Sequence, residues 1–274
     1  MKDYHIWANH AHVWPDNTRP GGDISCLKRL MEECSIEKAV CFAPFPDQYR
    51  RYGLTGDGVE WLANAIKGDS SLIGFGTIDF ENGSITDQVN RIADCGLMGI
   101  KLHPAYQEFN IMGDAACELY AAAQERGLFI SFHTGLHWHR ISDYKLLLFD
   151  EVAWNFPNLK FSMEHVGGYH FFRDALAVIC NNHHRDSDPR FVYAGLTSVS
   201  MEENGLPGFW SLSDEELRIL VSQGGNGCAI MGLDFPYKNA EYTKAAINRI
   251  ISLDIPEEAK EGILGRNLQA ALGL

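Results

Sequence analysis

Short apolar runs alternate with helical patterns along the whole chain of 274 residues. Most of these runs are continuously apolar, which is typical of strands that are buried on both faces of a parallel sheet. The expected strands are Tyr4–Ala8, Lys38–Ala43, Leu72–Ile78, Met98–Leu102, Leu128–Phe132, Lys160–Glu164, Arg190–Leu196 and Cys228–Leu233.

Helical patterns fill the stretches between the runs. Apolar residues from Ile85 to Ile92 recur at helical spacing. Ser213 and Glu216 form a capping-box signature ahead of another such pattern. After the last strand and its helix, the segment Pro256–Leu272 is expected to be a helical extension that caps the bottom or the side of the molecule.

The repeat of strand and helix predicts the fold class. Eight such units within roughly 250 residues match a (β/α)₈ barrel, so we expect residues 1–274 to form one barrel domain with a parallel eight-stranded core. A doubly wound open sheet is the alternative. That fold usually carries a glycine-rich phosphate turn after its first strand, whereas here the first strand is followed by Asn9-His10-Ala11-His12.

The charge balance excludes some classes of partner, and the cysteine pattern indicates the cellular compartment. The chain has 36 acidic against 23 basic side chains and a net charge of −13, which argues against nucleic acid and anionic lipid as partners. The seven cysteines are scattered without a CxxC pair, and no signal peptide is visible. We therefore expect a cytoplasmic protein with reduced thiols, and leave homo-oligomer formation open.

Polar side chains that bind metals end several strands. His10 and His12 are two apart and therefore point the same way on a strand, although this pair alone is a weak signal. His133, His165 and Asp234 each follow an apolar run. Any one of them reads as an ordinary polar strand end, but together they place imidazole and carboxylate ligands on one rim, where the active site of a barrel lies. Such ligands suit Zn²⁺, Fe²⁺ or Mn²⁺.

Lys101 closes the fourth strand, where a buried ammonium is costly unless it is paired. One interpretation is structural: the side chain reaches the rim or pairs with a carboxylate. The other is functional: a lysine with a lowered pKa, open to carbamylation or to contact with an anionic substrate.

The ordered set of motifs resembles the amidohydrolase superfamily, in its amidohydrolase-related branch of compact barrels. The segments that carry the likeness are HAH (10–12), GIKLHP (99–104), FHTG (132–135), EHVGG (164–168), GLDFP (232–236) and ILGRNLQAALGL (263–274). Together they run through the whole chain in order.

The resemblance implies roles for individual residues. His10, His12, His133 and Asp234 would bind the metal, and Asp234 would take the proton of the attacking water. His165 would be a proton donor or a ligand of a second metal. Lys101 matches the place where dihydroorotase-like relatives carry a carbamylated, metal-bridging lysine.

One departure concerns His10. Relatives often have an acidic residue two positions before the first histidine, where this chain has Ala8. The partner that orients His10 must therefore come from elsewhere.

The sequence predicts a metal-dependent hydrolase that cleaves a C–N or C–O bond (amide, ester or lactone) of a small carbonyl compound with a metal-activated water. Zn²⁺ comes first among the candidate metals, and one ion per chain is favoured over two. Four loop residues are candidates for substrate binding: Arg50, His103, His139 and Arg140.

Two alternatives stay open. The same branch also resembles metal-dependent non-oxidative decarboxylases of aromatic or unsaturated acids. We expect the chain to be shorter than many of those enzymes, which favours hydrolysis. A non-catalytic binding barrel is the third reading, and the set of strand-end ligands argues against it.

Overall fold

The computed structural model describes residues 4–183, 191–200 and 208–274. Its strands form a closed barrel in chain order, in which every neighbouring pair is parallel and β8 pairs with β1. The predicted eight-stranded parallel barrel is therefore confirmed. The strands are β1 (Trp7–His12), β2 (Lys38–Phe42), β3 (Leu72–Thr77), β4 (Gly99–Leu102), β5 (Phe129–His133), β6 (Phe161–Glu164), β7 (Val192–Thr197) and β8 (Ala229–Phe235).

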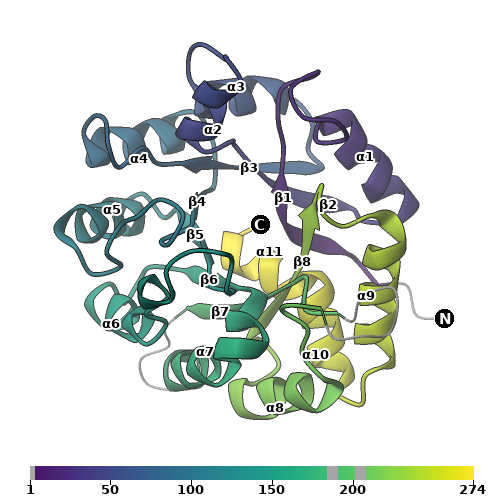
Figure 1. Cartoon of the computed structure of the whole chain (residues 1–274). Coiled ribbons are helices and arrows are strands. Elements are labelled where there is room, and N and C mark those ends of the chain that lie inside the picture. Colours follow the sequence, from purple (N-terminus) through teal and green to yellow (C-terminus); the bar gives the residue numbers. More distant parts are fainter. Residues whose placement is uncertain (1–3, 184–190, 201–207) are drawn as a thin grey trace.

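Helices surround the barrel (Figure 1). They are α1 (Ile24–Glu33), α2 (Pro46–Arg51), α3 (Gly58–Ala65), α4 (Ile85–Asp94), α5 (Asp114–Glu125), α6 (Leu148–Asn155), α7 (Gly168–His183), α8 (Asp214–Gly224), α9 (Ala240–Ser252), α10 (Glu257–Glu261) and α11 (Asn267–Leu272). None of the helices in the described ranges is long and apolar enough to span a membrane.

The first strand begins and ends later than expected. It runs over Trp7–His12 instead of Tyr4–Ala8, so both histidines of the HAH motif lie within the strand. His12 pairs with Phe42 of β2, whereas His10 lies at an irregularity between paired residues. The pairing is irregular there: the register with β2 shifts between Ala8 and Ala11, and His10 has a φ of 70°. A bulge of this kind is how strands re-aim a side chain next to a site.

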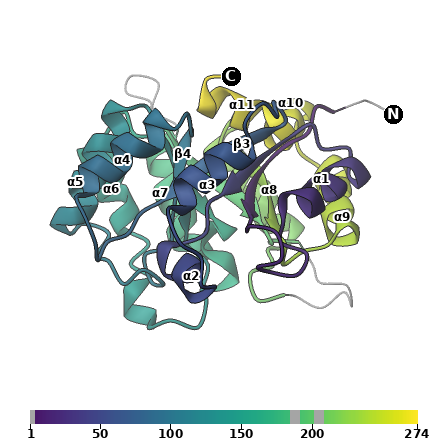
Figure 2. The ribbon, with the colours of Figure 1, turned by 90° about the horizontal axis from the view of Figure 1, so that it is seen from above.

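An apolar layer fills the lower interior of the barrel, and the C-terminal helix closes it. Phe42, Phe75 and Phe129 are buried and pack with other residues of the strands. Leu268 and Ala271 of α11 join this cluster. Figure 1 looks along the barrel with α11 across its centre, and Figure 2 shows α11 and α2 at opposite ends. The predicted helical extension therefore caps the bottom, away from the strand ends that carry the histidines.

Helix α8 begins at the capping box that the sequence indicates. The hydroxyl of Ser213 accepts a hydrogen bond from the backbone N–H of Glu216, and the Glu216 side chain accepts one from the backbone N–H of Ser213. Two backbone donors that a helix start leaves free are thus satisfied.

Replacing Ser213 tests this cap. We expect Ser213→Ala to lower the free energy of unfolding by about 1 kcal/mol, because one backbone N–H of the first turn loses its acceptor. Ser222→Ala, at an exposed position of the same helix, is the control and should change it little. Urea denaturation measures both, and equal midpoints for the two variants would contradict the role of the cap.

Candidate metal centre

The strand ends of β1, β5, β6 and β8 carry two adjacent groups of candidate metal ligands: His10, His12 and Asp234, and the pair His133 and His165. The ring centroids of His10 and His165 are 5.3 Å apart. These side chains rest on the apolar layer: the ring centroids of His10 and His12 lie 5.1 and 5.2 Å from that of Phe42. His10 and His165 are 1% exposed. The candidate ligands are His10, His12, His133, His165 and Asp234.

His10, His12 and Asp234 form the first half of the site. Their ligand atoms lie within 4.8 Å of one another. The Nε2 atoms of the two histidines are 3.3 Å apart, and Nε2 of His10 is 3.7 Å from Oδ1 of Asp234. Both His10 and Asp234 have a positive φ, a conformation that non-glycine residues adopt only where the surroundings hold them. The backbone is thus bent to bring these side chains together.

Glu164 holds His10 in place. It is fully buried, and its Oε2 accepts a hydrogen bond of 3.1 Å from Nδ1 of His10. This bond leaves the lone pair of the neutral imidazole on Nε2, the atom that faces His12 and Asp234. Glu164 is therefore the orienting partner that Ala8 does not provide. The donors to its carboxylate are Asn9, His10, Ser131, Ser162 and Thr197.

Two glycines make room for this carboxylate. A Cβ on Gly195 of β7 would overlap the carboxylate of Glu164, and one on Gly232 of β8 would overlap the hydroxyl of Thr197. Thr197 donates to Oε2 of Glu164 at 2.5 Å. Neither glycine has a positive φ, so both are needed for space. The barrel interior is shaped around Glu164 from two neighbouring strands.

His133 and His165 form the second half of the site. Nε2 of His133 donates to the carbonyl of Gly135 at 2.7 Å, and Nδ1 of His165 donates to the carbonyl of Thr197 at 2.8 Å. A carbonyl only accepts, so in the neutral imidazoles the other nitrogens carry lone pairs. These two nitrogens, Nδ1 of His133 and Nε2 of His165, face each other at 3.1 Å. Two facing lone pairs are an arrangement that a cation between them would stabilise.

The spacing of these nitrogens fits a metal. With bonds of about 2.0–2.1 Å, two nitrogen ligands of a tetrahedral zinc ion lie roughly 3.3 Å apart. The nitrogen pairs of this site are separated by 3.3 Å (His10 and His12) and 3.1 Å (His133 and His165). The nitrogen pairs therefore suit a divalent ion in spacing, and the rings of His10, His133 and His165 suit one in tautomer as well.

Burial keeps the ligands in the form that binds a cation. It lowers the pKa of His10, His12, His133 and His165 well below 6.5, so these imidazoles are neutral near pH 7. Burial also raises the pKa of Asp234. Ser198 donates to Oδ2 of that carboxylate at 2.6 Å, which leaves Oδ1 on the side of His10.

Lys101 lies beside the ligands without a hydrogen-bond partner among the described residues. Its Nζ is buried and lies 5.2 Å from the Phe42 ring centroid. Burial lowers the pKa of Lys101 to about 8, while Glu164 and Asp234 act in the opposite direction. The side chain neither pairs with a carboxylate nor reaches solvent, so neither part of the structural interpretation applies.

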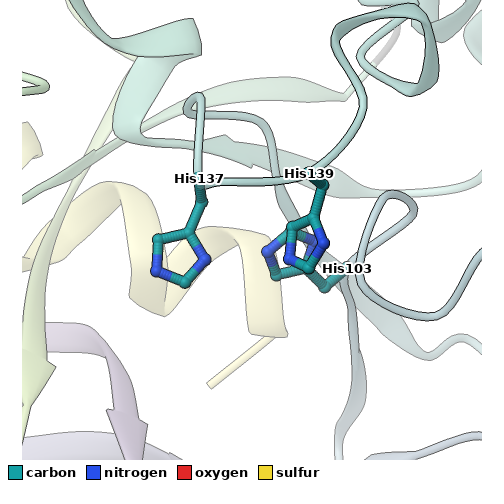
Figure 3. A group of neighbouring side chains, drawn as sticks. All are labelled: His103, His137 and His139. Carbon is teal, nitrogen blue, oxygen red and sulfur yellow. The ribbon is translucent and has the colours of Figure 1, made fainter.

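Figure 3 shows a second group of imidazoles, in which His137 and His139 point from one loop toward His103. His103 stacks on His133 with 3.8 Å between ring centroids. Nδ1 of His103 accepts a hydrogen bond of 3.2 Å from the backbone N–H of Tyr106, so the proton of the neutral ring is on Nε2. Nε2 is buried and without a partner among the described residues. Nε2–H of His103 is therefore a donor without an acceptor, whereas the facing nitrogens of His133 and His165 carry lone pairs.

The two candidate arginines have different surroundings. Arg50 donates to Asp79 at 2.7 Å, so its guanidinium already has a carboxylate partner. Arg140 is exposed on the loop that carries His139. Trp210, which is not among the site residues that the sequence predicts, packs on His165 with 4.0 Å between centroids and donates to the carbonyl of Leu136.

A comparison with known families decides the identity. The model of the amidohydrolase family matches residues 10–274, from the first candidate ligand to the end of the chain. The chain belongs to the amidohydrolase family. No curated protein sequence matches this amidohydrolase.

Solved structures share the fold of this amidohydrolase. A 5-carboxyvanillate decarboxylase from Sphingomonas paucimobilis aligns with a TM-score of 0.73 at 14% identity, over 99% of this chain and 100% of its own. A protein assigned as a 2-pyrone-4,6-dicarboxylic acid hydrolase from Pseudomonas putida gives 0.68 at 14% identity, over 99% and 98%. A dihydroxybenzoic acid decarboxylase from Polaromonas with bound manganese gives 0.67 at 13% identity, over 99% and 98%. The amidohydrolase fold thus serves both reactions, and chain length does not separate them here.

Glu164→Gln tests the orienting role of Glu164 in this amidohydrolase. An amide keeps the shape but turns one acceptor into a donor, so His10 is held less firmly and metal affinity should fall about 10- to 100-fold. Ser131→Ala removes only the 3.3 Å hydrogen bond to the same carboxylate and is the milder control. Competition with a chelator measures affinity. Wild-type affinity in the glutamine variant would show that Glu164 does not orient the ligand.

The metal-free amidohydrolase should lose stability as the pH falls below about 6.5. Burial lowers the pKa of five histidines in the folded state, so below that pH the unfolded chain binds more protons. Each contributes up to about 1.4 kcal/mol per pH unit. The raised pKa of Asp234 acts in the opposite direction, but it is one group against five: His10, His12, His103, His133 and His165.

Urea denaturation in the presence of a chelator measures this pH effect. The midpoint at about pH 5.5 should be well below that at about pH 7.5. Equal midpoints would mean that these histidines are not buried in their neutral form.

Proposed function

We propose that this amidohydrolase is a metal-dependent hydrolase that cleaves a C–N or C–O bond of a small carbonyl compound. His10, His12, His133 and Asp234 would hold one divalent ion, Zn²⁺ before Mn²⁺ or Fe²⁺. The observation that carries the proposal is the close approach of imidazole nitrogens at 3.1 and 3.3 Å. Hydrogen bonds at the far side of the rings of His10, His133 and His165 leave the lone pairs of these rings on the nitrogens that face the site. Side chains that merely pack together do not normally point lone pairs at each other, because no donor lies between them.

The ion would supply Lewis acidity: it polarises a carbonyl oxygen and lowers the pKa of water toward neutrality. Asp234 would accept a proton from the attacking water through Oδ1, because Ser198 already occupies Oδ2. Burial raises the pKa of this carboxylate, which makes it a stronger base than an exposed aspartate. The same group can then return the proton to the leaving atom.

His165 is better placed as a ligand than as an acid. Its Nδ1–H is committed to the carbonyl of Thr197, and the nitrogen that faces the site has no proton to give in the neutral ring. Burial holds its pKa well below 6.5. We therefore assign His165 to the metal or to an incoming hydrogen-bond donor, and not to protonation of the substrate.

His103 and Lys101 offer hydrogen-bond donors, whereas the candidate metal ligands offer lone pairs. Lys101 lies in β4 and His103 follows the last residue of that strand, and both have a buried donor without a partner among the described residues. A substrate oxygen is the group that would satisfy them, since unpaired buried donors are unfavourable. The site would thus hold a substrate between the metal ligands and the donors of β4.

Metal content and product analysis test the proposal. We expect the His10→Ala, His12→Ala double variant to lose most of its metal by elemental analysis. The matched control is His137→Ala, His139→Ala, which removes two histidines at the same spacing from the other cluster and should keep the metal of the wild type. Unchanged metal in the first variant would refute the assignment.

Asp234→Asn should keep the fold and lose at least roughly two orders of magnitude in turnover, since an amide cannot accept the proton. The assay pairs lactones, esters and amides with aromatic carboxylic acids. Release of an acid with an alcohol or amine supports hydrolysis. Release of CO₂ from an aromatic acid, without any hydrolysis product, would contradict hydrolysis and indicate decarboxylation.

A further inference from the structure

Arg19 lies in a collar of side chains around His12. The ring of His12 contacts Trp14 and Tyr237, with centroid distances of 6.0 and 5.9 Å. The Cζ atom of Arg19 lies 4.7 Å from the centroid of each of these two rings. Tyr237 belongs to the turn that follows Asp234, whose carbonyl accepts its backbone N–H at 2.8 Å. The guanidinium is therefore beside the metal ligands of both β1 and β8.

The loop between β1 and α1 is built to hold Arg19 there. The backbone N–H of Trp14 donates to the carbonyl of Gly22 at 2.9 Å, and the N–H of Gly22 donates to the carbonyl of Arg19 at 3.0 Å. A Cβ on Gly22 would lie 3.0 Å from Cε3 of Trp14 and 3.3 Å from Cδ of Arg19. The absence of a side chain at position 22 thus lets the arginine stem pack on the indole.

The charge of Arg19 is not neutralised within the described part of the chain. Arg91 and Arg249 are the other half-buried arginines there, and each forms an ion pair with an aspartate, Asp57 and Asp214 respectively. No carboxylate of the described residues pairs with Arg19. In a chain with a net charge of −13, a half-buried arginine without a carboxylate is a position where a ligand can supply one.

We propose that Arg19 binds a carboxylate of the substrate and so selects anionic substrates. The Cζ atom of Arg19 lies over the rings of both Trp14 and Tyr237, so cation–π contacts hold the guanidinium. A guanidinium has five N–H donors, enough for two parallel hydrogen bonds to a carboxylate beside a contact with Tyr237. Nε1 of Trp14 is a further buried donor without a partner among the described residues. The inference rests on the proposed function, because it takes a metal at His12 to hold the other end of the substrate.

Dicarboxylates and their half-amides test this on the metal-loaded protein. A series from malonate to adipate, each compared with the monoamide of the same length, scans the distance between the metal and Arg19. At one or more lengths the wild type should bind the dicarboxylate at least about tenfold more tightly than its half-amide. Arg19→Gln should abolish this preference, and Arg19→Lys should restore part of it, since a lysine keeps the charge without the planar pair of donors.

Arg50→Gln is the matched control, because Arg50 is an arginine already paired with Asp79, and it should keep the preference. A preference that persists in Arg19→Gln, or one that no length shows in the wild type, would overturn the proposal. Metal content separates the two hypotheses. Loss of the preference with metal content unchanged supports Arg19, whereas wild-type protein that holds no metal would refute the proposed function and the inference that depends on it.

Discussion

The buried carboxylate of Glu164 is the interaction on which the site depends. It carries no exposed surface, and the side chains around it donate to it from β1, β5, β6 and β7. A buried acceptor of this kind is stable only when it is fully hydrogen-bonded. The barrel meets this requirement with hydroxyls and an amide that have no other role in the site, and with two glycines that leave the necessary space. In return, Glu164 fixes which nitrogen of His10 can bind a cation.

The tautomers of the other histidines divide the site into a side that presents lone pairs and a side that presents an N–H donor. Carbonyls of Gly135 and Thr197 take the protons of His133 and His165, so lone pairs face the centre. After β4 the backbone N–H of Tyr106 donates to Nδ1 of His103, so the proton of that ring is on the opposite nitrogen, Nε2. Backbone groups at the strand ends thus decide which imidazoles turn a lone pair toward the site, as a cation ligand requires, and which one presents an N–H. A single type of side chain serves both functions because its neighbours differ.

The apolar layer and the candidate site occupy successive positions along the barrel axis. The phenylalanines of β2, β3 and β5 fill the lower interior, and α11 closes it from below. The histidines rest on the upper surface of this layer, through Phe42. Burial against the layer is also what lowers the pKa of the ligands and of Lys101. The core therefore sets the protonation state of the site as well as its position.

The sequence by itself determined the barrel, because continuous apolar runs and helical spacing repeat in a regular order. These local patterns predict buried parallel strands and the helices that cover them. It also supplied the candidate ligands, since His133, His165 and Asp234 each follow an apolar run. Only the tertiary structure assigned Glu164 to His10, because these residues are 154 positions apart and their contact depends on a bulge in β1. The same holds for Arg19, whose partners Trp14 and Tyr237 meet only where β8 closes on β1. Spacing along a chain predicts which side chains share a strand end, whereas the direction of each ring, its tautomer and its missing partner are set by neighbours that only barrel closure brings together.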